Sequence, residues 1–236
     1  MNLKALYSGL TLCILTLPQA FTQAFIQPVE TIPSLDCQLT LNDGSEINGT
    51  VRTALMVGGS VRSINIKDEN GEIHKYKAGD VQTLKVKMSG LAKLEAISEG
   101  SESLAELADL DFNEIINREY VIYEQALLAK KKDKYALLQL LNPGFDERLK
   151  VYLNPTGQET AGVAVGDLQL TGGNEKSYLV VKDGSKSMKV KKGSYKKDFS
   201  ELFGDCAEML KAFSGGRIKF GDMASHVLYY NKHCMR

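Results

Sequence analysis

Residues 41–51 read Leu-Asn-Asp-Gly-Ser-Glu-Ile-Asn-Gly-Thr-Val, and this stretch decides the fold of the N-terminal part of the chain. Its first residues, Asn42 to Ser45, favour a tight turn, so the chain reverses direction between two strands. In the second strand, Gly49 has no side chain and allows a sharp bend. A hairpin that leads into a bent strand is typical of a small, strongly curved β-barrel.

Short strands separated by turns continue after this hairpin. Alternating apolar and polar residues predict further strands at Val61–Lys67, Ile73–Tyr76 and Val81–Val86. The stretch Asp68-Glu-Asn-Gly71 is a strong hairpin signal between the first two of these strands. We therefore expect about five strands to form a small barrel within residues 25–88.

The pattern in residues 41–51, Leu-x-Asp-Gly-x-x-Ile-x-Gly-x-Val, resembles the opening of Sm-like and related SH3-like barrels. The resemblance implies a barrel architecture for this region. Sm-like rings bind RNA through later loop residues, for which we find no counterpart in this sequence. The resemblance therefore indicates architecture rather than function.

The remainder of the chain divides into three parts. Residues 89–117 carry apolar residues at spacings of three with acidic residues between them, which predicts a helical connector. Residues 118–192 return to strands, and the apolar run Tyr135–Leu141 predicts a central strand in a second antiparallel sheet of about five to seven strands. From residue 195 onward the period is helical, and Gly215-Gly216 separates two helices. The predicted fold class is mainly β with α (α+β), and residues 118–236 form an antiparallel-sheet domain with a C-terminal helical hairpin.

The first 24 residues have the layout of a secretory signal peptide. Lys4 supplies a positive charge, Ala5–Leu17 is an apolar run, and Thr22-Gln-Ala24 offers small residues to a signal peptidase. The run is too short for a membrane-spanning helix, which needs about 20 apolar residues, and no later segment is apolar enough to cross a bilayer. We expect cleavage near Ala24 and a secreted or periplasmic protein of the cell envelope that is not transmembrane after cleavage.

Three cysteines follow the predicted cleavage point, namely Cys37, Cys206 and Cys234. In an oxidising compartment two of them can pair. Cys206 lies on the first C-terminal helix and Cys234 just past the second, so antiparallel packing would bring them together, and we predict a disulfide between them. Three alternatives stay open for Cys37: it is buried and inert, it pairs with another chain, or it is the true partner of one of the other two.

The sequence contains no strong metal or cofactor motif. His226 and His233 are two helical turns apart, about 10 Å along the axis, which is too far to share one ion. The spacings His-x-x-x-His and Cys-x-x-Cys are missing as well. We expect no metal site and no cofactor, with His226 and His233 at the surface and His74 exposed on a strand.

A lysine cluster occupies residues 176–197. The candidate contacts to an anionic surface, such as lipopolysaccharide or an acidic polymer, are Lys189, Lys191, Lys192, Lys196 and Lys197. The alternative, which we favour, is an edge hairpin that lysines keep soluble and unpaired. The whole chain has 29 basic and 29 acidic residues, so its net charge gives no argument for nucleic acid or an anionic membrane as partner.

No catalytic constellation is recognisable in the sequence. The motifs Gly-x-Ser-x-Gly and His-Glu-x-x-His, a P-loop and a dinucleotide-binding glycine run are all missing. No catalytic residue is assigned, and the sequence leans towards a protein that is not an enzyme. A glycosidase-like carboxylate pair stays open, because the two members of such a pair are distant in sequence.

A second resemblance rests on the closing pattern Phe203-x-Asp-Cys206 and Tyr230-Asn-x-x-Cys234, together with runs at 118–124, 137–145 and 151–152. These residues resemble a group of secreted proteins of Bacteroidota to which no activity is assigned. The resemblance implies an envelope or extracellular location and brings no functional residue with it.

The sequence favours a non-enzymatic binding or structural role in the cell envelope, with an envelope protein or polymer as partner and no nucleic acid. The alternative is an envelope hydrolase with paired carboxylates, and a nucleic-acid-binding barrel is the less favoured third hypothesis. A deep pocket with two carboxylates about 5–9 Å apart would favour the hydrolase. A continuous basic stripe with aromatics would favour nucleic acid. A shallow surface with neither feature would favour the binding role.

Overall fold

The structure is a computed structural model, and it describes residues 25–26, 29, 31–87, 119–127, 135–155, 163–165, 168–171, 177–213 and 218–234. The predicted signal peptide (1–24) and the predicted helical connector (89–117) lie outside the described residues. Within the described part of the chain, no helix is both long enough and apolar enough to cross a membrane.

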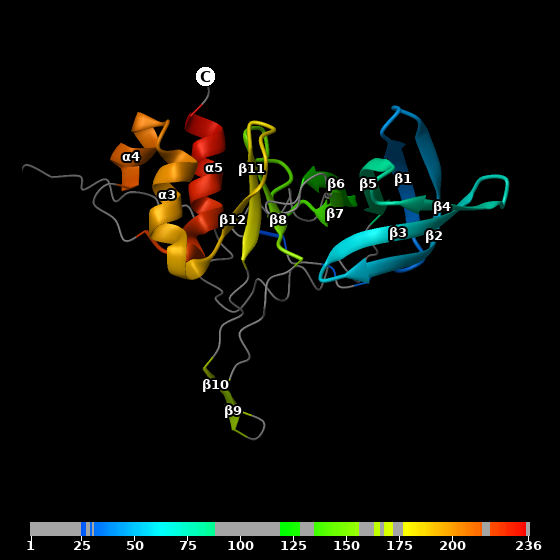
Figure 1. Cartoon of the computed structure of the whole chain (residues 1–236), viewed down its shortest axis with the longest axis horizontal. Coiled ribbons are helices and arrows are strands. Elements are labelled where there is room, and N and C mark those ends of the chain that lie inside the picture. The colour runs from blue at the N-terminus through cyan, green and yellow to red at the C-terminus, as the bar shows by residue number, and fades with distance from the viewer. Residues whose placement is uncertain are drawn as a thin grey trace, which may run out of the picture.

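Six antiparallel strands close into a barrel at one end of the molecule (Figure 1). Around the ring the order is β2 (Glu46–Val57), β1 (Asp36–Leu41), β5 (Val81–Lys87), β6 (Tyr120–Leu127), β7 (Tyr135–Gln139) and β3 (Ser60–Asp68). The ring closes because β3 pairs again with β2. The seventh strand, β4 (Ile73–Lys77), is not part of the ring. It pairs with β3 further along that strand than β7 does.

The sequence predicted the whole barrel within residues 25–88. In the structure, two strands of the barrel, β6 and β7, lie outside this range. The five strands expected in that range are present. Without further strands, however, β5 and the first residues of β3 would each have one edge without a hydrogen-bonding partner. Strand β6 pairs with β5, and β7 pairs with Ser60 and Val61 of β3. Closing the ring satisfies the backbone groups of both edges, which explains why the later strands join it.

Gly49 is needed where β2 crosses close to β3. A methyl group at this position would lie 2.4 Å from the carbonyl oxygen of Lys67 and 2.7 Å from a side-chain carbon of Ile66. Any other residue would push the two strands apart. The predicted role of Gly49 in a bent strand is in line with this close approach.

Strand β7 is buried on both of its faces. Leu137 points into the barrel core, whereas Ala136 and Leu138 belong to a separate cluster outside the barrel wall. Burial on both faces explains the continuous apolar run that the sequence shows here. The predicted strand is thus present, but its predicted place in the second sheet was wrong, because β7 lies between β6 and β3 in the barrel.

The second sheet has three strands, β12 (Met188–Val190), β11 (Tyr178–Lys182) and β8 (Leu149–Leu153). The prediction of about five to seven strands in this sheet was wrong, because β6 and β7 complete the barrel instead. Strands β9 (Val163–Val165) and β10 (Leu168–Thr171) form a separate pair. One bridge, between Leu140 and Tyr152, continues β7 towards β8 and so connects barrel and sheet.

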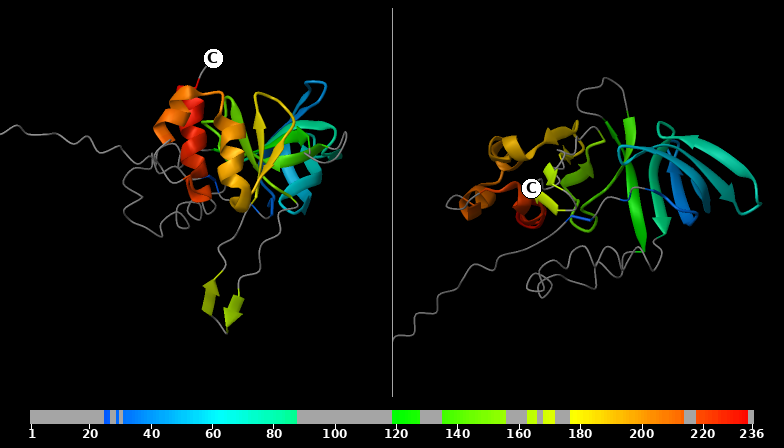
Figure 2. Two further views of the ribbon diagram at one scale, coloured as in Figure 1. Left: turned by 60° about the vertical axis from the view of Figure 1, so that its left-hand side comes forward. Right: turned by 90° about the horizontal axis from the view of Figure 1, so that it is seen from below.

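The second sheet is the middle layer between the barrel and the helices (Figure 2). Tyr152 and Leu179 on one face pack against the outer barrel wall. Val151, Val180 and Val190 on the other face join the core formed with the helices. Neighbouring residues of β8 and β11 therefore point to opposite layers, as the pleat of a strand requires.

The helical part comprises α3 (Tyr195–Phe203), α4 (Ala207–Phe213) and α5 (Met223–His233), with short 3-10 turns η2 (Lys192–Ser194) and η3 (Phe220–Asp222) before α3 and α5. The sequence predicted one helix over the region of α3 and α4. It is interrupted at Gly204, a poor helix former, whose N–H donates to the carbonyl of Ser200 at the end of α3. The next residue, Asp205, is bonded to groups on the second sheet and on α5.

The predicted disulfide between Cys206 and Cys234 is confirmed. It joins the start of α4 to the end of α5, with the two Cα atoms 5.6 Å apart. Cys37 is buried in the barrel core, and it is the free cysteine of the described residues. The predicted fold class, mainly β with a small barrel, a second antiparallel sheet and disulfide-linked C-terminal helices, is confirmed.

The chain just after the predicted signal peptide contacts both the second sheet and the barrel. The ring of Phe25 packs edge-on against Tyr178 of β11, with 5.1 Å between centroids. The N–H of Ile26 donates to the carbonyl of Leu141, and the N–H of Val29 donates to the buried side chain of Gln139. A cleavage site downstream of Val29 would therefore remove the contacts of Phe25, Ile26 and Val29.

We predict that the double variant Cys206→Ser/Cys234→Ser unfolds at lower urea concentration than the wild type. The loop closed by the disulfide spans 28 residues of sequence separation, so the loss is roughly 3–4 kcal/mol in the chain-entropy model. Equilibrium unfolding with and without a reductant measures it. Reductant should destabilise the wild type and leave the double variant unchanged. Peptide mapping without reductant that finds both cysteines alkylated would contradict the disulfide.

Candidate functional site

The end of the barrel where β1 begins and β3 ends contains an open hollow of about 320 Å³. Its lining is polar and carries both signs of charge. The lining residues are Asp36, Cys37, Gln38, Asn48, Gly49, Thr50, Lys67, Asp68, Glu69, Lys87 and Tyr120. They come from five strands of the ring and one turn, so closure of the barrel is what brings them together.

Gly49 of β2 is one of the residues that line the hollow. Gly49 pairs with Cys37 on one side and with Asp68 on the other. A side chain at this position would collide with β3. The thiol of Cys37 lies at the buried end of the lining, where burial and then the charge of Asp36 raise its pKa to about 11. The thiol is therefore protonated at neutral pH and a poor nucleophile.

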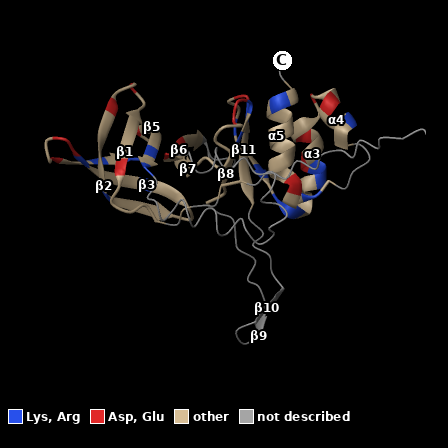
Figure 3. Cartoon of the chain, turned by 180° about the vertical axis from the view of Figure 1, so that it is seen from behind, with Lys and Arg blue, Asp and Glu red and all other residues tan. Residues whose placement is uncertain are grey.

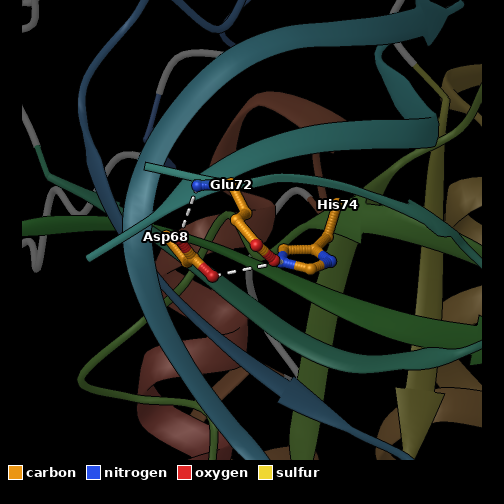
Figure 4. Close-up of side chains that lie close together, drawn as sticks. All are labelled: Asp68, Glu72 and His74. Atoms are coloured by element: carbon orange, nitrogen blue, oxygen red, sulfur yellow. Dashed lines mark hydrogen bonds and ion pairs between the residues drawn. The ribbon is translucent and has the colours of Figure 1, made fainter. Parts of the chain in front are cut away.

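At the rim of the hollow, the hairpin of β3 and β4 brings together Asp68, Glu72 and His74 (Figure 4). The Nε2 atom of His74 lies 3.1 Å from Oδ2 of Asp68 and 3.7 Å from Oε2 of Glu72. One potential ligand atom from each residue lies within 4.8 Å of the others. Within the described part of the chain, this is the group whose ligand atoms are spaced to hold a metal ion.

Asp68 is held in place by the turn that it begins. Its Oδ1 atom accepts hydrogen bonds from the backbone N–H of Asn70 and of Glu72, at 3.0 and 2.8 Å. This leaves Oδ2 facing the imidazole of His74. Loss of hydration works against the charged form of Asp68, but the hydrogen bonds from Glu72, His74 and Asn70 prevail and lower its pKa.

The predicted lysine cluster does not meet this site. Lys191, Lys196 and Lys197 are exposed, around η2 and the start of α3. Lys189 is half-buried on the edge strand β12, and Lys192 is exposed and begins η2. Basic and acidic residues occur together on the barrel and on the helical part (Figure 3). Lys189 on an edge strand is in line with the protective role that the sequence favoured.

The expectation that His226 is a surface residue was wrong. It is 2 % exposed and surrounded by aromatic rings, with the rings of Phe213 and Phe199 at 4.6 and 5.1 Å between centroids. Its Nδ1 atom and the hydroxyl of Tyr195 share a hydrogen bond of 2.6 Å. Burial lowers its pKa to about 4, against a smaller opposing effect of Asp222. His233 and His74 are exposed as expected.

One pair of carboxylates lies where β6 of the barrel meets the second sheet. Lys150 donates to both oxygens of Glu124 at 2.9 Å and lies 3.9 Å from Asp146. The hydroxyl of Tyr152 also donates to Glu124, at 2.6 Å. Burial raises the pKa of Asp146, and the charge of Lys150 opposes this. A lysine that contacts both carboxylates is typical of a structural ion pair that joins two layers.

Polar residues of the C-terminal pattern, Asp205, Tyr230 and Asn231, form a second polar network. Asp205 accepts hydrogen bonds from Lys182 at 2.7 Å, from Arg148 at 3.1 Å and from Tyr230 at 2.8 Å. Burial would raise the pKa of Asp205, but these donors outweigh it and lower the pKa to about 2. The side chain of Asn231 accepts from the N–H of Arg148 at 2.9 Å. These residues hold the helices to the second sheet.

Sequence reasoning missed the group at the rim although a signal was present. The predicted hairpin Asp68-Glu-Asn-Gly71 places residues 68 and 72 opposite each other, and His74 pairs with Ile66 two positions further on. Side chains two apart on a strand share a face. Alternation along a correctly predicted hairpin would therefore have brought all three side chains together.

Comparisons with protein-family models, with curated proteins and with solved structures gave no match. The resemblance to secreted proteins of Bacteroidota stays a prediction.

We predict that stability falls as the pH is lowered from about 6.5 to 4. The pKa of His226 is about 4 in the folded protein and about 6.5 in an unfolded chain. The unfolded state then binds more protons in this window, so the stabilisation is complete above it and is lost on acidification, by up to roughly 3 kcal/mol. Urea unfolding at a series of pH values measures the loss.

The variant His226→Phe should flatten this part of the pH dependence, although it leaves the hydroxyl of Tyr195 without its partner. His233→Ala is the matched control, because it removes an exposed histidine from the same helix. An unchanged pH dependence in His226→Phe would contradict the assignment.

Proposed function

We propose that this chain is a secreted or cell-envelope protein with a non-enzymatic binding role, and that the hollow at the end of the barrel receives the ligand. The observation that carries the proposal is the open, polar lining of that hollow. Strands bring exposed side chains such as Gln38, Asn48 and Lys87 to one surface. Side chains of this kind recognise a ligand by hydrogen bonds and charge.

The disulfide supports the proposed location. A structural disulfide such as Cys206–Cys234 persists in oxidising compartments, and it is rare in the cytosol. The predicted signal peptide, with cleavage near Ala24, points the same way. An envelope protein or polymer is the partner that this location favours.

The hollow favours the binding role over the two alternatives. Its lining mixes Lys67 and Lys87 with Asp36, Asp68 and Glu69, so it is not the continuous basic stripe with aromatics that binds single-stranded nucleic acid. The carboxylates of Glu124 and Asp146 are both engaged by Lys150. A hydrolase would need one carboxyl free to act as acid and the other as base or nucleophile.

We predict that the full mature protein captures a partner from isolated envelope fractions, and that Asn48→Arg lowers this capture at least about tenfold. The arginine fills the hollow from an exposed strand position, and a buried clash or unpaired charge at a contact costs on the order of 1–3 kcal/mol. Quantitative mass spectrometry and carbohydrate analysis of the bound material measure the change.

The matched control is Gln82→Arg, which makes the same change of charge at an exposed position of β5 that does not line the hollow. Capture that Gln82→Arg reduces as much as Asn48→Arg does would place the contact elsewhere. Failure of the wild type to retain any protein or polymer would count against the binding role itself.

A further inference from the structure

We propose that Asp68, Glu72 and His74 bind one divalent transition-metal ion at the rim of the barrel. The three side chains come from one hairpin and direct one imidazole nitrogen and two carboxylate oxygens at a common point (Figure 4). The proposal does not depend on which ligand the hollow takes, because the three donors form a site of their own.

Two of the three separations between the donor atoms are close to those around a metal ion. Ligands at about 2.0–2.2 Å from an ion, at octahedral or tetrahedral angles, lie about 2.8–3.6 Å apart. The 3.1 Å from Nε2 of His74 to Oδ2 of Asp68 falls within this range. The 3.7 Å to Oε2 of Glu72 is slightly longer than this range, and rotation of the Glu72 side chain, which is 74 % exposed, can supply the difference.

The backbone prepares this site before any ion arrives. Two N–H donors fix Oδ1 of Asp68, so the free oxygen already faces His74. The cross-strand register sets the other two donors, since His74 pairs with Ile66 and the N–H of Asp68 donates to the carbonyl of Glu72. Little conformational entropy remains to be lost by Asp68 on binding.

The electrostatics of the group also favour a cation. Two carboxylates share one imidazole, and within the described residues neither carboxylate forms an ion pair with a lysine or arginine. An ion would bind the lone pair of Nε2, with the imidazole proton on Nδ1, and a shared contact with the metal would replace the hydrogen bond between His74 and Asp68. Protons compete with the ion for imidazole and carboxylate ligands, so binding weakens on acidification.

The donor set identifies the class of ion. Imidazole nitrogen suits Zn²⁺, Ni²⁺ and Cu²⁺, whereas Ca²⁺ and Mg²⁺ prefer sites built from oxygen alone. Three protein ligands leave at least one coordination position open. Because Asp68 also lines the hollow, that position lies beside the surface proposed to receive a ligand.

The test is titration of the metal-free mature protein, without a histidine tag, with Zn²⁺ and with Ni²⁺ by calorimetry. We expect one site in the wild type and at least about tenfold weaker binding in His74→Ala. Glu72→Gln should weaken binding as well, and its exposed position protects the fold. Asp68→Asn should do the same, because asparagine keeps the oxygen that accepts from Asn70 and Glu72.

His233→Ala serves as the matched control, since His233 is an exposed histidine on α5 whose ring contacts Tyr229 instead of carboxylates. It should bind as the wild type does. Absence of binding in the wild type at about 1 mM metal would overturn the proposal. Binding that survives in both His74→Ala and Glu72→Gln would overturn it too, because the ion would then lie elsewhere. Circular dichroism of each variant checks that it is folded.

Discussion

Strand β7 carries the constraint on which the other parts of the structure depend. It closes the barrel by pairing with β6 and with the first residues of β3. Its opposite face supports the second sheet through Ala136 and Leu138. Each fully buried leucine here contributes roughly 2 kcal/mol of burial free energy, so one short strand stabilises two cores. Without it, the ring would have two open edges, and the second sheet would lose its contacts with Ala136 and Leu138.

Closure of the ring also creates the candidate site. The hollow needs the ends of β1, β2, β3, β5 and β6 at one place, and an open sheet would spread them apart. Gly49 lets β2 approach β3 closely, and the hairpin after β3 then directs Asp68 towards the rim. Closure of the barrel thus positions both the hollow and the three donor residues Asp68, Glu72 and His74.

Local patterns in the sequence predicted the elements, and long-range pairing decided how they assemble. Turns such as Asp68–Gly71 and the alternation of β3 and β5 depend on neighbours in sequence, which is why they were predicted well. Partners for β5 and β3 lie across a long connection, and period alone does not identify them. His226 was misjudged for a similar reason, because the helices and turn that bury it become neighbours only in the folded chain. The disulfide was the exception, because the predicted helical hairpin alone places Cys206 near Cys234, without reference to the rest of the chain.

The residues that carry the predicted resemblance to secreted Bacteroidota proteins make structural contacts within the fold. Asp205, Tyr230 and Asn231 are occupied with Arg148, Lys182 and the backbone at the seam between helices and sheet. Side chains so engaged have few donors or acceptors left for a ligand. The hollow, by contrast, is lined by exposed residues such as Gln38 and Asn48 that the fold does not need. Substitutions in the lining that leave these contacts at the seam intact would therefore change the choice of ligand while the architecture stays the same.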